Sequence, residues 1–159
     1  MFREVTRKKQ SLTKEECLRI LKETKRGVLS LIGDGGFPYG VPLDHYYNER
    51  DGKIYFHSGK SGHKIDAVKN CPKVSYCVLE DGTPDARQPW ALRFRSVIVF
   101  GTVEFVTDRE TVFGIASELS RKFTDDEDYI RTELQRSGPV TAMFALTPAH
   151  ITGKITEES

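Results

Sequence analysis

The chain has 159 residues, of which 38% are hydrophobic and 30% are charged, so we expect one soluble domain over residues 1–159. Its 24 basic residues nearly balance its 23 acidic ones, and this near-neutrality argues against nucleic acid or membrane partners. No apolar run approaches the roughly 20 residues that cross a bilayer, and no apolar stretch follows the basic start as in a secretory signal.

Three cysteines, Cys17, Cys71 and Cys77, cannot all pair within one chain. We therefore expect free thiols and a reducing, cytoplasmic location. The cysteines have no histidine at zinc-binding spacing, and the four histidines are scattered, so we expect no metal site.

The first predicted helix begins at a capping box, in which Thr13 is followed three positions later by Glu16. Gly27 is predicted to end this helix. A strand is expected over residues 28–32, followed by a glycine-rich turn over residues 33–36.

Residues 37–47 are predicted to be extended but contain Pro38 and Pro42. Proline cannot donate to a sheet ladder, so these positions indicate an edge strand or a bulge. Some backbone groups near residues 41–43 should therefore be free for another partner.

The remaining elements are mostly strands, with an Asp51-Gly52 hairpin signal and a bulge expected at Gly101. Asp108 should cap a helix whose apolar period reaches Phe123. In chain order we expect strand 53–57, loop 58–62, helix 63–70, strand 73–79, loop 80–89, strands within 90–106, helix 109–123, helix 125–136, strand 140–146 and a short strand 151–155. This order predicts a mainly β fold, an antiparallel sheet or barrel with peripheral helices.

Two of the predicted strands have an outer face whose side chains should be buried by another element. In strand 53–57 the side chains of Tyr55 and His57 point away from the core, and residues 97–100 are apolar on both faces. A helix or a partner subunit should lie over them, and we expect a homodimer.

The run from Tyr55 to Lys64 is the best candidate for a binding site. It combines glycines, hydroxyls, Lys60 and Lys64 with a helix start after Gly62. Such a helix start presents unpaired N–H groups to an anion, although a solvated turn with a capped helix would look similar. The spacing is not that of a Walker loop, so we predict a phosphate site that is not an NTPase site.

Seven segments, in order along nearly the whole chain, resemble the pyridoxamine 5′-phosphate oxidase-like superfamily, and most closely its 5-nitroimidazole resistance (Nim) branch. They are MFRE (1–4), PYGVPL (38–43), GKIYFHS (52–58), GHKIDA (62–67), KVSYCV (73–78), RSVIVFG (95–101) and ITGK (151–154). The resemblance implies an antiparallel split β-barrel homodimer with FMN at the subunit interface.

The resemblance also implies which residues contact the cofactor. The isoalloxazine ring would lie along Val41, Pro42 and Leu43, and the phosphate would lie near Ser58 and the basic pair His63 and Lys64. His57 would sit beside the flavin as the catalytic residue, Arg95 and Ser96 would come from the partner, and Ser75 and Cys77 would approach from a neighbouring strand. The full set of implied cofactor-binding residues is Val41, Pro42, Leu43, His57, Ser58, His63, Lys64, Ser75, Arg95 and Ser96.

The predicted function is that of an FMN-dependent oxidoreductase acting on a small acceptor, such as a nitroimidazole. A non-catalytic flavin store or redox sensor is the alternative, and a haem-handling protein is a more distant one. Pyridoxamine phosphate oxidase is less favoured, because the chain ends without the Arg- and His-bearing arm of that enzyme. Trp90 is either a core residue or a lid over the flavin.

Overall fold

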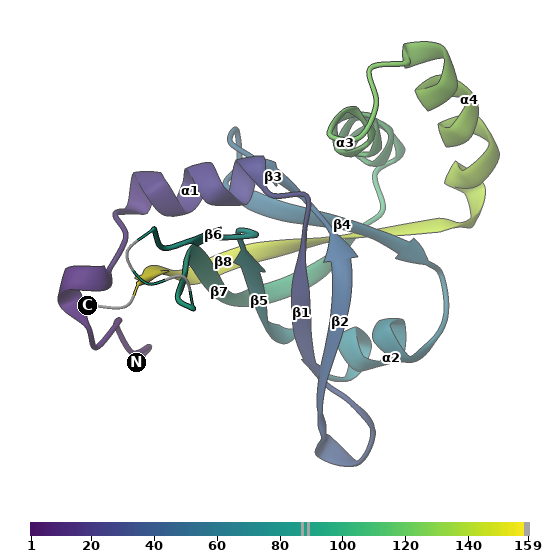
Figure 1. The fold of residues 1–159 in the computed structure, drawn as a ribbon. Coiled ribbons are helices and arrows are strands. Elements are labelled where there is room, and N and C mark those ends of the chain that lie inside the picture. Colours follow the sequence, from purple (N-terminus) through teal and green to yellow (C-terminus); the bar gives the residue numbers. More distant parts are fainter. Residues whose placement is uncertain (87, 89, 158–159) are drawn as a thin grey trace.

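The computed structural model describes residues 1–86, 88 and 90–157. Neighbouring strands are antiparallel and follow the order β2-β1-β5-β7-β8-β4-β3, with the short β6 on β7. The strands are β1 (Arg26–Ile32), β2 (Pro38–Asp44), β3 (Tyr46–Asn48), β4 (Lys53–Gly59), β5 (Lys73–Leu79), β6 (Thr83–Pro84), β7 (Leu92–Val106) and β8 (Thr141–Thr156). The helices are α1 (Lys14–Glu23), α2 (His63–Asn70), α3 (Arg109–Arg121) and α4 (Glu127–Ser137), and short 3₁₀ turns are η1 (Lys8–Gln10), η2 (Asp34–Gly36) and η3 (Gly138–Val140). The sheet curves into an antiparallel split β-barrel with the helices outside it (Figure 1), as predicted.

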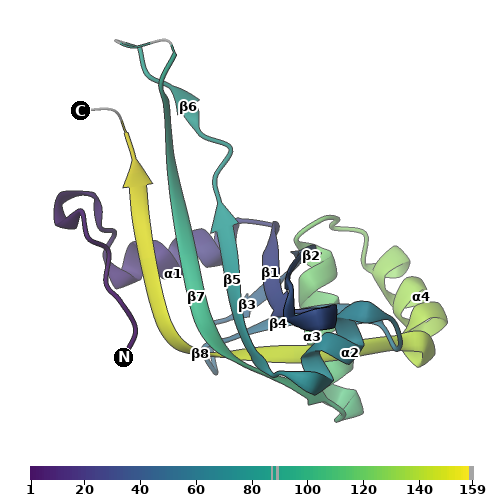
Figure 2. The same cartoon turned by 90° about the horizontal axis from the view of Figure 1, so that it is seen from below.

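The long strands β7 and β8 bend together, and this bend closes one side of the barrel (Figure 2). Their register shifts between Phe100 and Gly101, which confirms the bulge expected at Gly101. A Cβ atom at Gly101 would lie 2.2 Å from the carbonyl oxygen of Thr147, so the two backbones can meet only at a glycine. The prediction of two separate strands at the C-terminal end was wrong, because pairing with β7 continues through Pro148 and makes β8 a single strand.

Helix α1 packs against the barrel and buries Cys17, Ile20 and Leu21. The capping box is confirmed, because the Thr13 hydroxyl accepts from the Glu16 amide and the Glu16 carboxylate accepts from the Thr13 amide. The main core cluster contains Cys17, Ile20, Leu21, Leu29, Leu31, Leu43, Tyr47, Ile54, Phe56, Ala67, Val68, Val74, Tyr76, Val78, Val97, Val99, Val103, Phe144 and Leu146.

Gly27 does not end α1, contrary to the prediction. The helix ends at Glu23, and Gly27 lies within β1, paired with Leu43 of β2. A Cβ atom at Gly27 would be 2.4 Å from the carbonyl oxygen of Cys77, so glycine is required there by close packing.

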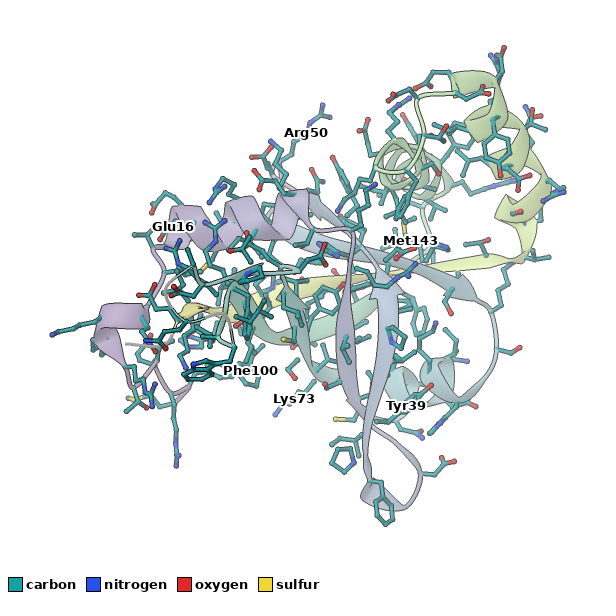
Figure 3. The ribbon with its side chains drawn as sticks, viewed as in Figure 1. Glu16, Tyr39, Arg50, Lys73, Phe100 and Met143 are labelled. Carbon is teal, nitrogen blue, oxygen red and sulfur yellow. The ribbon has the colours of Figure 1, made fainter. Side chains whose placement is uncertain are left out.

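The face of β4 that carries Tyr55 is covered by α3. Tyr55 is buried and forms a second cluster with Ile115, Met143 and Ala145. Figure 3 shows Met143 on β8 beneath this helix. Of the two covers expected for this face, a helix therefore lies over Tyr55, whereas His57 on the same strand remains exposed.

The other apolar strand has one covered face only. Val97 and Val99 are fully buried, but Ile98 and Phe100 remain 40% and 39% exposed. Phe100 lies on the side of the sheet away from α1 (Figure 3), stacked on Phe2 of the N-terminal segment. No described element of the chain buries this outer face completely.

Several boundaries differ from the expected ones. Strand β4 continues to Gly59, and within the loop expected over 80–89 the strand β6 pairs with the start of β7. Positions 87 and 89 of that loop lie outside the described residues. Asp108 caps α3 as predicted, but the helix ends at Arg121, before Phe123. Among the described residues, no helix is long and apolar enough to cross a membrane.

Candidate functional site

The barrel is split between the edge strand β2 and strand β4, and a groove of about 510 Å³ lies there. Within the described sheet β2 pairs only with β1, which confirms the free backbone edge predicted from the prolines. The groove is lined by Arg26, Pro42, Leu43, Asp44, His57, Ser58, Gly59, Lys64, Val140 and Thr141. Five of the predicted site residues therefore meet in it, namely Pro42, Leu43, His57, Ser58 and Lys64.

One wall of the groove is suited to an anion. Helix α2 begins after Gly62, whose φ of 113° brings the chain sharply into the helix, and no side chain caps this helix. Partial burial lowers the pKa of Lys64 from its usual value, because the ammonium group has lost water. A phosphate in the groove would meet the Lys64 ammonium group near the start of this helix, where the helix dipole favours negative charge.

His57 lies at the end of β4, between the two walls of the groove. Its pKa is lowered because surrounding protein atoms remove water from the imidazolium and because Lys64 repels it, while Asp44 opposes the shift. The ring is therefore mainly neutral at pH 7, with one nitrogen able to donate and one able to accept.

Arg26 and Asp44 are site residues that the sequence interpretation missed. They face each other across the β1–β2 pair and form a two-point ion pair, with Nε–Oδ1 and Nη2–Oδ2 distances of 2.6 and 3.1 Å. With the first helix predicted to end at Gly27, Arg26 is not expected on a strand, whereas it is the first residue of β1. The length of the β1–β2 turn sets the strand register that places Arg26 beside Asp44. The turn length is therefore the sequence signal that could have predicted this ion pair.

His63 does not line the groove with Lys64. Its ring stacks on Tyr39 at a centroid distance of 4.2 Å, and its Nε2 atom is 3.3 Å from the Asp34 amide. Within one chain, His63 thus joins α2 to the β1–β2 turn. The resemblance-based contact of His63 with a phosphate stays a prediction.

The other predicted cofactor residues lie outside the groove of one chain. Val41 packs partly against the barrel core. Ser75 and Ser96, like Cys77, lie half-buried on β5 and β7. Arg95 forms a two-point ion pair with Glu80, with distances of 2.8 and 2.6 Å. Trp90 is 75% exposed, so it is not a core residue of the single chain.

Comparison with known proteins agrees with this architecture. A sequence model of the family described as pyridoxamine 5′-phosphate oxidase matches residues 13–155. The fold and the split-edge groove thus define an antiparallel split barrel, and the chain belongs to the pyridoxamine 5′-phosphate oxidase family. No curated protein matches the chain.

Solved structures with the same fold include three whose descriptions name a ligand or a role. A candidate 5-nitroimidazole antibiotic resistance protein from Bacteroides thetaiotaomicron is 22% identical, with a TM-score of 0.74 over 91% of this chain and 86% of its own. An FAD-binding protein from Mesorhizobium loti is 26% identical, with a TM-score of 0.64 over 94% and 97%. An FAD and haem binding protein from Mycobacterium smegmatis is 22% identical, with a TM-score of 0.75 over 94% and 74%.

Proposed function

We propose that this protein binds a flavin nucleotide, FMN, in the groove between β2 and β4 and transfers electrons to a small acceptor. The observation that carries the proposal is the meeting of an unpaired sheet edge with a cationic, uncapped helix start in one groove. Family membership and the FAD-binding relative support the cofactor class. We also propose a cytoplasmic location, given that all three cysteines are free thiols.

The phosphate end of the cofactor would lie against α2. Lys64 supplies a positive charge, Ser58 a hydroxyl donor and the first turn of the helix its free amides. The groove also contains Asp44, but its charge is compensated by Arg26. The net electrostatic character of the groove therefore suits a dianion.

The ring end would lie along β2. An isoalloxazine has carbonyl and imino acceptors and one N–H donor on its edge, and an unpaired backbone strand offers the complementary groups. Pro42 limits the donors of this edge, since it has no N–H, and leaves its carbonyl group available. When bound, a flavin supplies redox chemistry in one- or two-electron steps.

His57 is the residue that we assign to the acceptor. It lies in the groove next to Asp44 and is mainly neutral at pH 7 because its pKa is lowered. We propose that it orients the acceptor by a hydrogen bond and can pass it a proton. The electrons would come from a separate reductant.

We further propose that the active form is a homodimer. The outer face of β1, β5 and β7 leaves Val28, Ile98 and Phe100 between 39% and 40% exposed, which is unusual for three neighbouring apolar side chains of one sheet. A second copy packed there would cover this face and could bring its Arg95 and Ser96 to the cofactor.

The test is an absorbance spectrum of the purified protein, followed by titration of the stripped protein with FMN and with FAD. We expect a yellow protein that binds FMN, and a Lys64→Gln variant whose affinity is about tenfold weaker from loss of a charged phosphate contact. Lys73→Gln, an exposed lysine on β5 outside the groove, is the control and should bind normally. A colourless protein that takes up neither nucleotide would overturn the proposal, and a preference for FAD would correct the cofactor.

A further inference from the structure

A second, larger groove lies between the helices α3 and α4 and the strands β4 and β8, with a volume of about 1190 Å³. It joins the first groove, because Asp44, His57 and Thr141 line both. Figure 1 shows how α3 and α4 stand off from the barrel at the end remote from the N-terminus. A molecule in this groove would reach the residue that we assign to the acceptor.

The walls of this second groove are mainly apolar. Met143, Val112 and Ala116 form its inner side, where α3 meets β8. Phe113 and Phe123 lie farther out and are 50% and 49% exposed. Aromatic side chains exposed toward a groove are typical of sites for flat or elongated apolar ligands.

The charges in this groove are not balanced. Its two acidic residues are already paired, Asp44 with Arg26 and Glu133 with Arg136. Lys69 and Arg109 also line it, are exposed, and form no ion pair with any described residue.

Lys60 is a third cation in the groove. Its ammonium group donates to the carbonyl oxygen of Pro139 and so links the end of β4 to η3 across the groove. Together with Lys69 and Arg109, it leaves the groove with uncompensated positive charge beside its apolar walls.

We infer that the groove between α3, α4 and β8 binds a small aromatic molecule that carries one anionic group, with its ring on the phenylalanine wall and its anion at Lys69 and Arg109. Such a molecule would be the acceptor of the proposed oxidoreductase, and only this last step rests on the proposed function. Anionic aromatic compounds complement both the apolar walls and the unpaired cations, whereas a neutral apolar molecule would leave the cations unused.

The test compares 2-naphthoate with the neutral 2-naphthamide, which has nearly the same shape. Isothermal titration calorimetry is performed on protein saturated with FMN, so that the first groove is filled. We expect one naphthoate per chain, bound about fivefold more tightly than the amide, since each exposed ion pair contributes up to about 1 kcal/mol. A Lys69→Gln/Arg109→Gln variant should lose most of the preference for the acid, because only Lys60 remains, whereas Lys8→Gln/Lys9→Gln should retain the fivefold preference.

The apolar wall is tested with Phe113→Asp, which places a negative charge at an exposed position of the groove. We expect naphthoate affinity to fall at least tenfold, while Phe37→Asp, at an exposed phenylalanine in the β1–β2 turn, changes nothing. Thermal unfolding checks that both variants fold. The inference is overturned if acid and amide bind equally to the unaltered protein, or if Phe113→Asp affects only the oligomeric state, which would mean that a second copy fills the groove. If FMN does not bind, the same titrations without it still decide this inference while the proposed function fails.

Discussion

At the scale of single residues, two histidines with lowered pKa values have opposite surroundings. His57 is exposed in the groove and can exchange protons with a ligand or with water. His45 is fully buried, with its Nε2 atom 2.6 Å from the carbonyl oxygen of Leu21 and its Nδ1 atom 2.9 Å from the Tyr76 hydroxyl. A carbonyl cannot donate, so Nε2 carries the proton of the neutral ring and Nδ1 is an acceptor. The Tyr76 hydroxyl lies 2.9 Å from both Nδ1 and the carbonyl oxygen of Leu43, so these two acceptors compete for its single proton.

For His57 we expect His57→Ala to lower the turnover number by about a hundredfold, as is typical when a general acid is removed. FMN affinity should change less than threefold, because the phosphate and ring contacts remain. The pKa of His57 is lowered below its usual 6.5, so the ring loses its proton at a pH below 6.5. Any activity that needs the protonated ring should therefore decline as the pH rises through that range. Steady-state kinetics from pH 5 to 8 measures this; an unchanged turnover number in the variant would remove His57 from the reaction.

For His45 we expect acid to destabilise the fold. Burial is the main cause that lowers its pKa to about 4, with repulsion from Lys122 next. The folded state thus binds fewer protons than the unfolded state between pH 6.5 and 4, so stability falls as pH falls through this window, by about 3 kcal/mol in total. Urea unfolding at pH 7 and pH 4.5 should show this loss of stability. His45→Asn should lose less stability between the two pH values, and its remaining loss comes from other groups that titrate. Equal losses in both proteins would contradict the assignment.

At the scale of elements, close approach of backbones decides where strands can pair. β1 passes so near β5 that Gly27 has no room for a side chain, and β7 meets β8 in the same way at Gly101. These glycines allow two pairs of strands within the curved sheet, β1 with β5 and β7 with β8, to approach closely. The groove depends on this curvature, since β2 and β4 face each other only because the sheet between them bends.

The strand contact at Gly27 can be tested against a helical glycine with free space around it. Gly27→Ala should lower the free energy of unfolding by about 2–3 kcal/mol, because the new methyl group would overlap the Cys77 carbonyl and the Tyr76 ring. Gly114→Ala in α3, where nothing lies within 4 Å of the added atom, should raise it by roughly 0.5–1 kcal/mol through helix propensity. Urea denaturation measures both, and similar effects of the same sign would show that packing at Gly27 is looser than described.

At the scale of the whole molecule, the two faces of β7 have different partners. Val97 and Val99 fill the barrel core, whereas Ile98 and Phe100 belong to an outer face that stays open in the single chain. Burying an apolar face of this kind stabilises association by roughly 25 cal/mol for each Å² removed from water, before the entropic cost of assembly.

We expect Ile98→Asp to convert a dimer into a monomer, because a buried carboxylate without a partner would be placed at the interface. FMN affinity should fall when the dimer dissociates, since the proposed contribution of the partner to the site would be lost. Tyr129→Asp, at an exposed position on α4, is the control and should stay dimeric. Sedimentation equilibrium measures the association state; a wild-type chain that is monomeric at all concentrations would contradict the homodimer.

The sequence by itself determined the β-rich architecture, the capping box of α1 and the edge character of β2, whereas the meeting of Pro42, Leu43, His57, Ser58 and Lys64 was implied by the family resemblance. The first three depend on local signals, such as capping residues, prolines and strand alternation, which act within a few positions of the chain. Only the tertiary structure decided the positions of Arg26, Asp44 and His63, the cover of Tyr55 by α3 and the second groove. Each of these depends on which distant segments pack together, and packing is set by register and close backbone approach rather than by local propensity.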